Sequence, residues 1–157
     1  MIAYSIQGLA FAPTIFERMF LRIPDGRLDE RESPDRFTPR EVIAHVADWE
    51  PIFLSRMQTA VDSPGSTVMV FDEGELAREH RYAEQSPLEC LARFRRSRLE
   101  TVAWLIGVPH EDFRKQVVHP ERGPMTVDDL ASYVYAHDAY HFEQLSSFLG
   151  ERTAGTW

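Results

Sequence analysis

The sequence predicts an all-α protein, a four-helix bundle in which long connections join consecutive helices. Two observations carry this prediction. Four segments repeat apolar residues at steps of three and four, the spacing of helices that each bury one face. Three of these segments open on a helix-start signal, at Thr38, Ser86 and Thr126. The chain of 157 residues is long enough for one domain, expected over 1–150, with a flexible tail at 151–157.

The first helix is predicted over residues 3–22, and its apolar pattern contains Pro13. Proline lacks the backbone donor and clashes with the preceding turn. Either the helix kinks there, or its regular part begins there. The run Pro24-Asp25-Gly26 ends the helix, and the charged segment 27–37 is predicted to be a solvated connection.

The second helix is predicted from Thr38 to about Val61. Thr38 is its N-cap, proline follows at the first helical position, and Glu41 stands at the third. The apolar stripe has His45 at its edge and consists of Val42, Val46, Trp49, Phe53, Met57 and Ala60. The following connection, 62–85, is long for a compact domain, which predicts a lid or a crossover.

The third helix is predicted from Ser86 to about Ile106. Its apolar stripe consists of Leu88, Leu91, Ala92, Leu99, Val102, Ala103 and Ile106. Arg95 falls near the centre of that stripe, so it needs a partner: an internal carboxylate, or an anionic group of a substrate. Residues 107–125 are predicted to form a loop. Three histidines in connections are expected at the surface, namely His80, His110 and His119.

The fourth helix, from Thr126 to a stop at Gly150, carries the strongest chemical signal. Its buried stripe consists of Leu130, Val134, His137, His141, Leu145 and Phe148. Steps of about 100° per residue place the two histidines about 40° apart near the middle of this stripe, so both point into the protein. An unsatisfied buried imidazole costs about 1–3 kcal/mol. Metal binding and hydrogen bonding within the core remain alternatives for the pair.

A third ligand would favour the metal. Metal sites of helix bundles are built from inward residues of facing helices, and His45 on the second helix is the remaining candidate. Three neutral imidazoles leave a divalent ion with open positions, as in catalytic sites. Candidates to line an adjacent substrate pocket are Trp49, Tyr133 and Tyr140. Acidic residues near the proposed ligands are expected on solvated faces, namely Asp48, Asp138 and Glu143.

Composition excludes several classes of function. Cys90 is the only cysteine, which rules out an intrachain disulfide and a thiolate metal site, so any ligands are nitrogen or oxygen. The formal charge of −8 argues against nucleic acid and anionic membrane surfaces as partners. No apolar run is long enough to cross a bilayer and no signal peptide is visible, so a cytoplasmic protein is expected.

The order of three motifs resembles the DinB-like superfamily over essentially the whole chain. They are the run TPREVIAHVADWE at 38–50, the run GPMTVDDL at 123–130, and His137-x3-His141. The resemblance implies a four-helix bundle with a divalent metal, nickel or zinc or else iron, held at the matching positions His45, His137 and His141. Bacillithiol and mycothiol transferases are among the relatives, which implies a low-molecular-weight thiol as co-substrate.

These observations lead to one functional hypothesis and an alternative. The first is a metal-dependent thiol S-transferase or hydrolase that uses the three-histidine site on a small-molecule substrate. The alternative is a non-catalytic metal-binding protein of the stress response. A homodimer is expected in either case.

Overall fold

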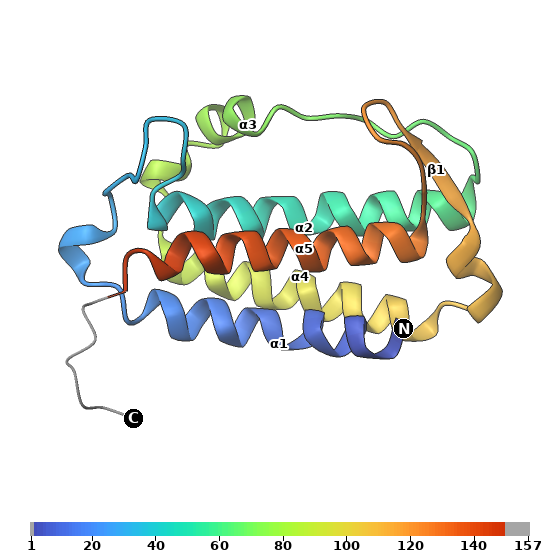
Figure 1. The fold of residues 1–157 in the computed structure, drawn as a ribbon, viewed down its shortest axis with the longest axis horizontal. Coiled ribbons are helices and arrows are strands. Elements are labelled where there is room, and N and C mark those ends of the chain that lie inside the picture. The colour runs from blue at the N-terminus through green and yellow to red at the C-terminus, as the bar shows by residue number, and fades with distance from the viewer. Residues whose placement is uncertain (1, 150–157) are drawn as a thin grey trace.

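The computed structural model describes residues 2–149. Four long helices run alongside one another (Figure 1): α1 Ile2–Phe20, α2 Pro39–Asp62, α4 Pro87–Gly107 and α5 Val127–Ser146. Helix α2 packs against α4 and α5, and α1 packs against the same two helices. The predicted four-helix bundle is confirmed, with α1 and α2 at diagonal corners. Within residues 2–149, no helix combines the length and the hydropathy of a membrane span.

The directions of the helices explain the long connection between α2 and α4. In Figure 1, α1 and α5 run one way along the bundle, and α2 and α4 run the other way. Because α2 and α4 are parallel neighbours, the chain between them must return along the length of the bundle. The crossover expected for 62–85 is therefore present, and it contains the short helix α3 Glu73–Glu79 and the 3-10 helix η2 Tyr82–Glu84.

All three predicted helix starts are confirmed, and two of them are stabilised by a side-chain capping hydrogen bond. At α2, Glu41 N donates to Thr38 Oγ1 at 3.2 Å and Thr38 N donates to Glu41 Oε2 at 2.9 Å. Thr126 and Asp129 form the same reciprocal capping box at α5, at 3.1 and 2.9 Å. Ser86 stands at the N-cap of α4 but makes no side-chain cap hydrogen bond.

Two helix ends differ from the sequence prediction. Helix α1 is continuous from Ile2 to Phe20 through Pro13, so the regular part does not begin at the proline. Helix α5 ends at Ser146, where the predicted stop was Gly150. Gly150 itself and the predicted tail 151–157 lie outside the described residues.

The connection between α4 and α5 contains an antiparallel hairpin where the sequence predicted a loop. Strand β1 Gln116–His119 pairs with β2 Gly123–Thr126, after the 3-10 helix η3 His110–Arg114. Strands of four residues are too short to show a clear alternating pattern. Strand β1 packs against α2 and buries alternate residues, so His119 is 5% exposed and its predicted surface position was wrong.

The buried face of α4 also differs from the prediction. Leu88, Leu99 and Ile106 are exposed, and the buried side consists of Cys90, Leu91, Phe94, Arg98, Thr101, Val102 and Leu105. The helix carries two partly overlapping apolar stripes. The stripe that faces the core includes Arg98 and Thr101, so its sequence is less apolar than that of the stripe predicted to be buried. Arg95 consequently lies exposed and forms an ion pair with Glu17 at 2.6 Å.

A polar layer crosses the middle of the bundle between two apolar clusters. One cluster gathers Phe16, Val42 and Leu145 with their neighbours, and the other gathers Phe53 and Val134 with theirs. Between them along the helices lie buried polar residues: His45, Glu50, Arg98, Thr101, Asp138, His141 and Gln144. The bundle thus places its candidate chemistry at a level where three helices face one another.

Candidate metal centre

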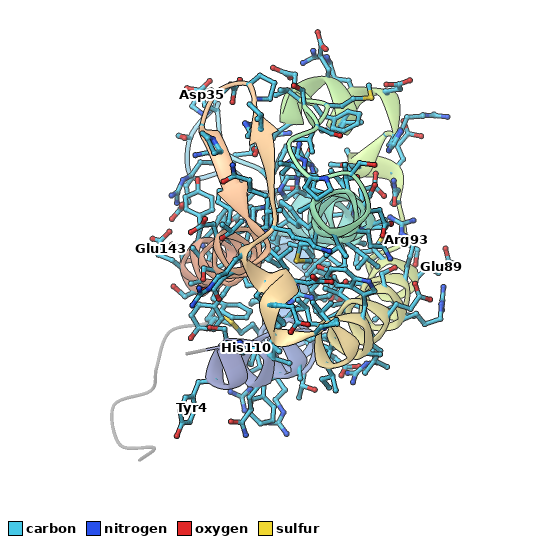
Figure 2. All side chains as sticks on the ribbon, turned by 90° about the vertical axis from the view of Figure 1, so that its right-hand side faces the viewer. Tyr4, Asp35, Glu89, Arg93, His110 and Glu143 are labelled. Carbon is cyan, nitrogen blue, oxygen red and sulfur yellow. The ribbon has the colours of Figure 1, made fainter. Side chains whose placement is uncertain are left out.

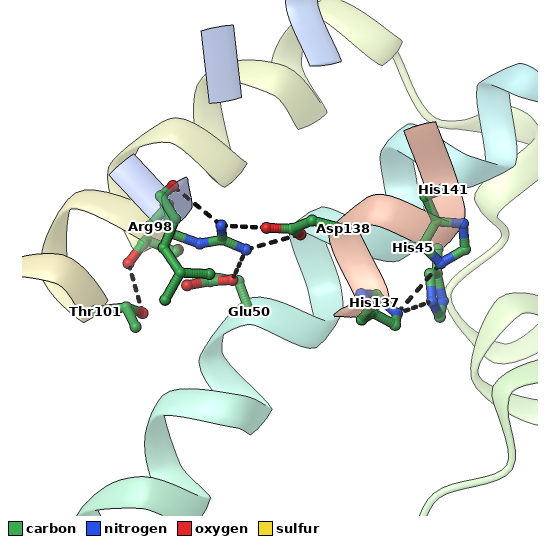
Figure 3. A network of polar contacts seen from close by, with 9 residues as sticks. His45, Glu50, Arg98, Thr101, His137, Asp138 and His141 are labelled. Atoms are coloured by element: carbon green, nitrogen blue, oxygen red, sulfur yellow. Dashed lines mark hydrogen bonds and ion pairs between the residues drawn. The ribbon is translucent and has the colours of Figure 1, made fainter. Parts of the chain in front are cut away.

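The three predicted histidines meet within this polar layer (Figure 3). His45 Nε2 lies 2.9 Å from His137 Nε2, which in turn lies 3.2 Å from His141 Nε2. One ring nitrogen from each residue falls within 4.8 Å of the others. His45 comes from α2, whereas the other two stand one turn apart on α5, the helix packed against it.

The tautomer of His141 is fixed by a side-chain amide. Gln144 Nε2 donates to the carbonyl of Phe37 at 2.9 Å, so its Oε1 is left to accept. His141 Nδ1 lies 3.0 Å from that oxygen and therefore carries the ring proton. The lone pair of His141 Nε2 then points at the other two imidazoles, the orientation of a metal ligand held by an outer partner.

Burial keeps all three imidazoles neutral at pH 7. His45 is fully buried and His141 is 3% exposed, while His137 is partly exposed. Desolvation lowers the pKa of His45 and of His137 well below the ordinary 6.5, and the neighbouring histidines act in the same direction. Burial lowers the pKa of His141 to about 4. Neutral imidazole is the form that binds metal ions.

Hydrogen bonds among the three imidazoles cannot satisfy all of their ring nitrogens. Because the lone pair of His141 Nε2 is free, the contact with His137 Nε2 requires a proton on His137. That same proton would also have to serve the 2.9 Å contact with His45. His45 Nδ1, also buried, finds no partner among the described residues. The hydrogen bonds that a metal-free core would need are therefore incomplete.

A divalent cation fits the same nitrogens. Two nitrogens bound at about 2.1 Å to one ion, at octahedral or tetrahedral angles, lie about 3.0–3.4 Å apart. The separation of 3.2 Å lies in that range and that of 2.9 Å falls just below it, while all three nitrogens lie within 4.8 Å of one another. The donor set contains three neutral nitrogens and no thiolate, which suits zinc, nickel or iron(II).

Aromatic rings enclose the buried side of the histidines. Phe37, Trp49 and Tyr82 surround His45, with ring centroids 5.0, 5.5 and 6.3 Å away. Phe53 packs edge-on against His137 at 5.1 Å. These contacts limit the rotation of the imidazoles and keep water from the inner side of the site.

The outer side opens into two adjoining cavities beneath the crossover. One, of about 310 Å³, is lined by Glu73, Tyr133, Ala136, His137, Tyr140 and His141. The second, of about 190 Å³, shares Glu73, Tyr140 and His141 with the first and adds residues 35–37, Gly74 and Gln144. Burial raises the pKa of the Glu73 carboxyl. A larger cavity, of about 540 Å³, lies beside Phe37 and Tyr82, and none of the three histidines lines it.

The predicted pocket residues divide into those that reach the site and one that does not. Trp49, 5% exposed, contacts His45 and forms part of the inner wall. Tyr133 and Tyr140 line the larger opening. Arg95 does not take part, since it lies on the outer face of α4. Its proposed role beside the substrate is therefore withdrawn.

The acidic residues behave in three different ways. Glu143 is exposed on the outer side of α5, as predicted (Figure 2). Asp48 is mostly covered and forms ion pairs with His80 and with Arg93, the latter at 2.8 Å. Asp138 is only 2% exposed, so its predicted solvated position was wrong.

Asp138 belongs to a buried network that sequence reasoning missed (Figure 3). Arg98 binds Asp138 through two hydrogen bonds of 2.6 and 3.0 Å, and Glu50 through one of 2.7 Å. The guanidinium also donates to the carbonyl of Leu9 at 3.2 Å. The network links α1, α2, α4 and α5 and carries two carboxylates for one guanidinium. The available signal on α4 was the pair of polar residues Arg98 and Thr101, which follow Phe94 at helical spacing.

The comparisons with known proteins agree with this architecture. Residues 9–145 match the family model of the DinB superfamily. No curated protein matches the chain.

Two solved structures share the fold. One is YfiT from Bacillus subtilis, described as a probable metal-dependent hydrolase with an unusual four-helix bundle topology. It is 20% identical to this chain, and the two structures superpose with a TM-score of 0.86. The match covers 94% of this chain and 85% of YfiT. A mycothiol-dependent maleylpyruvate isomerase is 12% identical, with a TM-score of 0.74 over 97% of this chain. This chain spans 62% of that isomerase. At these identities the likeness establishes the fold.

Proposed function

Because the chain belongs to the DinB superfamily, we propose that its three histidines form the metal centre of a hydrolase or thiol S-transferase. The observation that carries the proposal is the convergence of three neutral imidazole nitrogens at the inner end of a cavity open to solvent. A structural metal site is usually closed by four protein ligands, whereas three leave room for a reacting molecule. The likeness of the fold to a probable metal-dependent hydrolase adds support.

The chemistry follows from the residues around that position. A divalent ion held there would lower the pKa of a bound water or thiol and so supply a nucleophile at neutral pH. Tyr133 and Tyr140 line the cavity in which a substrate would lie. Glu73 stands in both openings, and its raised pKa suits a group that exchanges a proton with a molecule in the cavity.

A thiol nucleophile would have to come from a co-substrate. The only cysteine, Cys90, is buried and its Sγ lies 3.0 Å from Gln85 Oε1. Burial raises the pKa of the Cys90 thiol, which disfavours the thiolate. One fold neighbour depends on mycothiol. We propose a low-molecular-weight thiol in the same role here, and a cytoplasmic setting for it.

Metal content tests the proposal. Tag-free protein is analysed by elemental mass spectrometry beside the single variants His45→Ala, His137→Ala and His141→Ala. We expect one divalent ion per chain, lost in each variant while the helical circular dichroism is retained. His110→Ala, which removes an exposed histidine from η3, is the control and keeps the ion. A triple histidine variant with unchanged metal content would exclude the site.

Exchangeable coordination separates an enzyme from a metal-binding protein without catalysis. The protein is loaded with cobalt, and azide or a low-molecular-weight thiol is added while the visible spectrum is recorded. A spectral change that saturates is expected for a centre with an open position. A spectrum that neither probe alters would favour the non-catalytic alternative.

A further inference from the structure

A second groove, separate from the histidines, lies between the outer face of α2 and the start of the crossover. Its volume is about 390 Å³, within the range of small-molecule sites. Its lining contains one cation, three hydroxyls, no carboxylate and several apolar side chains: Pro51, Ile52, Ser55, Arg56, Thr59, Thr67, Val68, Met69 and Phe71. In a chain of formal charge −8, a groove without any acidic residue is distinctive.

Arg56 is the charged group of this groove, and its hydrogen bonds are incomplete. The residue is 6% exposed. Its Nη2 donates to the carbonyl of Met69 at 2.8 Å, and its buried Nε finds no acceptor among the described residues. No Asp or Glu side chain in the described part of the chain forms an ion pair with it. Arg98, equally buried, has two carboxylate partners.

The surroundings of Arg56 add positive charge. His119 is buried close to Arg56 and Arg122. Burial lowers the pKa of the His119 imidazole most, and the positive charges of Arg56 and Arg122 lower it further. Tyr133 and Glu121 act on the pKa of Arg56 in the opposite direction to Arg122, but Glu121 forms no ion pair with Arg56. Burial lowers the pKa of Arg56, yet a guanidinium stays protonated at pH 7. A buried cation without a counter-ion is costly, and a bound anion would offset that cost.

We propose that this groove binds a small organic anion with an apolar body, such as a medium-chain fatty acid or an aryl carboxylate. The carboxylate is received by Arg56, whose planar guanidinium suits two parallel hydrogen bonds. The hydroxyls of Ser55 and Thr67 lie in the same lining, and Ile52 and Phe71 supply apolar contact.

The proposed anion site is independent of the metal centre. The guanidinium carbon of Arg56 lies 5.8 Å from the centre of the Trp49 ring, and that ring lies 5.5 Å from the ring of His45. The indole therefore separates the two sites. A ligand on Arg56 does not have to reach the histidines, and its binding should survive their loss.

The test compares octanoate with octan-1-ol, which has the same chain length and no charge. Binding to the protein as purified is measured by isothermal titration calorimetry. We expect octanoate to bind at least tenfold more tightly than the alcohol. Arg56→Met should remove that preference, and Arg56→Lys should retain part of it. Arg78→Met, which removes an exposed arginine from α3, is the matched control and should leave binding unchanged.

A second pair of variants does not depend on a buried residue. Met69 is 72% exposed at the edge of the groove. Met69→Glu places a negative charge there and should weaken octanoate binding at least threefold relative to Met69→Gln. His137→Ala should bind octanoate as the parent does, which separates this site from a carboxylate on the metal centre. Equal affinity for octanoate and octan-1-ol, absent binding, or octanoate binding unaffected by both Arg56→Met and Met69→Glu would overturn the proposal.

Discussion

Arg98 on α4 donates two hydrogen bonds to Asp138 on α5, from Nη1 to Oδ2 at 2.6 Å and from Nη2 to Oδ1 at 3.0 Å. Asp138 directly follows His137 in the sequence, so the ion pair and the metal centre share one turn of α5. Helices α4 and α5 stand at diagonal corners of the bundle, and the pair joins them through its centre. Asp138 and His137 leave the helix about 100° apart, so the ion pair forms beside the metal centre.

Asp138→Ala should destabilise the fold strongly. Removal of one partner of a buried ion pair leaves the other charge without compensation and typically costs about 3–5 kcal/mol. Glu50 would still accept from Arg98 at 2.7 Å, which places the expected loss toward the lower part of that range. Urea unfolding followed by circular dichroism measures it.

The matched control for Asp138→Ala is Glu143→Ala. Glu143 lies on the same helix but is exposed, and its contact with Arg36 is 3.4 Å long. Its removal should leave the unfolding midpoint almost unchanged. Similar midpoints for both variants would show that the buried pair does not stabilise the bundle.

The same pair shows why part of the site could not be predicted from sequence. The sequence shows an aspartate on α5 and an arginine on α4, but residue type alone does not tell whether they are exposed or form a buried ion pair. Apolar periodicity therefore placed Arg95 in the core and Asp138 in solvent, and both placements were wrong. Burial of a charge is decided by its partner, and that partner lies 40 residues away in the chain.

The predictions that held depended on local chemistry. The start of α2 at Thr38 and of α5 at Thr126 follows from hydrogen bonds within four residues. The meeting of His137 and His141 follows from helical spacing alone. His45 required the bundle as a further premise, because its distance from His137 is set by how α2 packs on α5.

The metal-free protein should lose stability as the pH falls from 7 toward 4, in part because of His141. Its pKa is lowered from 6.5 to about 4, so the unfolded chain binds more protons in this window. Stability therefore rises with pH, and the contribution is complete above about pH 7. A lowering of this size corresponds to about 3 kcal/mol.

Asp138 changes stability with pH in the opposite direction, so its contribution must be separated from that of His141. Burial raises its pKa from 3.8 to about 6, so its contribution to stability grows as the pH falls through that value. The difference in unfolding free energy between the parent and His141→Asn, both treated with chelator, cancels Asp138. We expect this difference to shrink by about 3 kcal/mol between pH 7 and pH 4. A constant difference would refute the assignment to His141.

Thr38→Ala should destabilise the protein more than Ser86→Ala. Thr38 accepts from Glu41 N at 3.2 Å within a complete capping box, and loss of such a cap costs about 1 kcal/mol. Ser86 occupies the same position of α4 but makes no cap hydrogen bond, so its replacement should have almost no effect. Thermal and urea unfolding of the two variants provide the comparison. Equal losses would mean that the reciprocal bonds at Thr38 contribute nothing beyond the position itself.

The outer face of α4 predicts self-association. Leu88, Leu99 and Ile106 are 63%, 58% and 70% exposed and lie on one stripe of the helix. An exposed apolar stripe of this length favours burial against another surface, and we propose a second copy of this chain as the partner. Sedimentation equilibrium should detect a dimer that Leu99→Glu dissociates. Leu21→Glu, at an exposed position just beyond α1, is the control and should leave the dimer intact. If the parent protein remains monomeric at high concentration, the prediction of a dimer through this stripe is wrong.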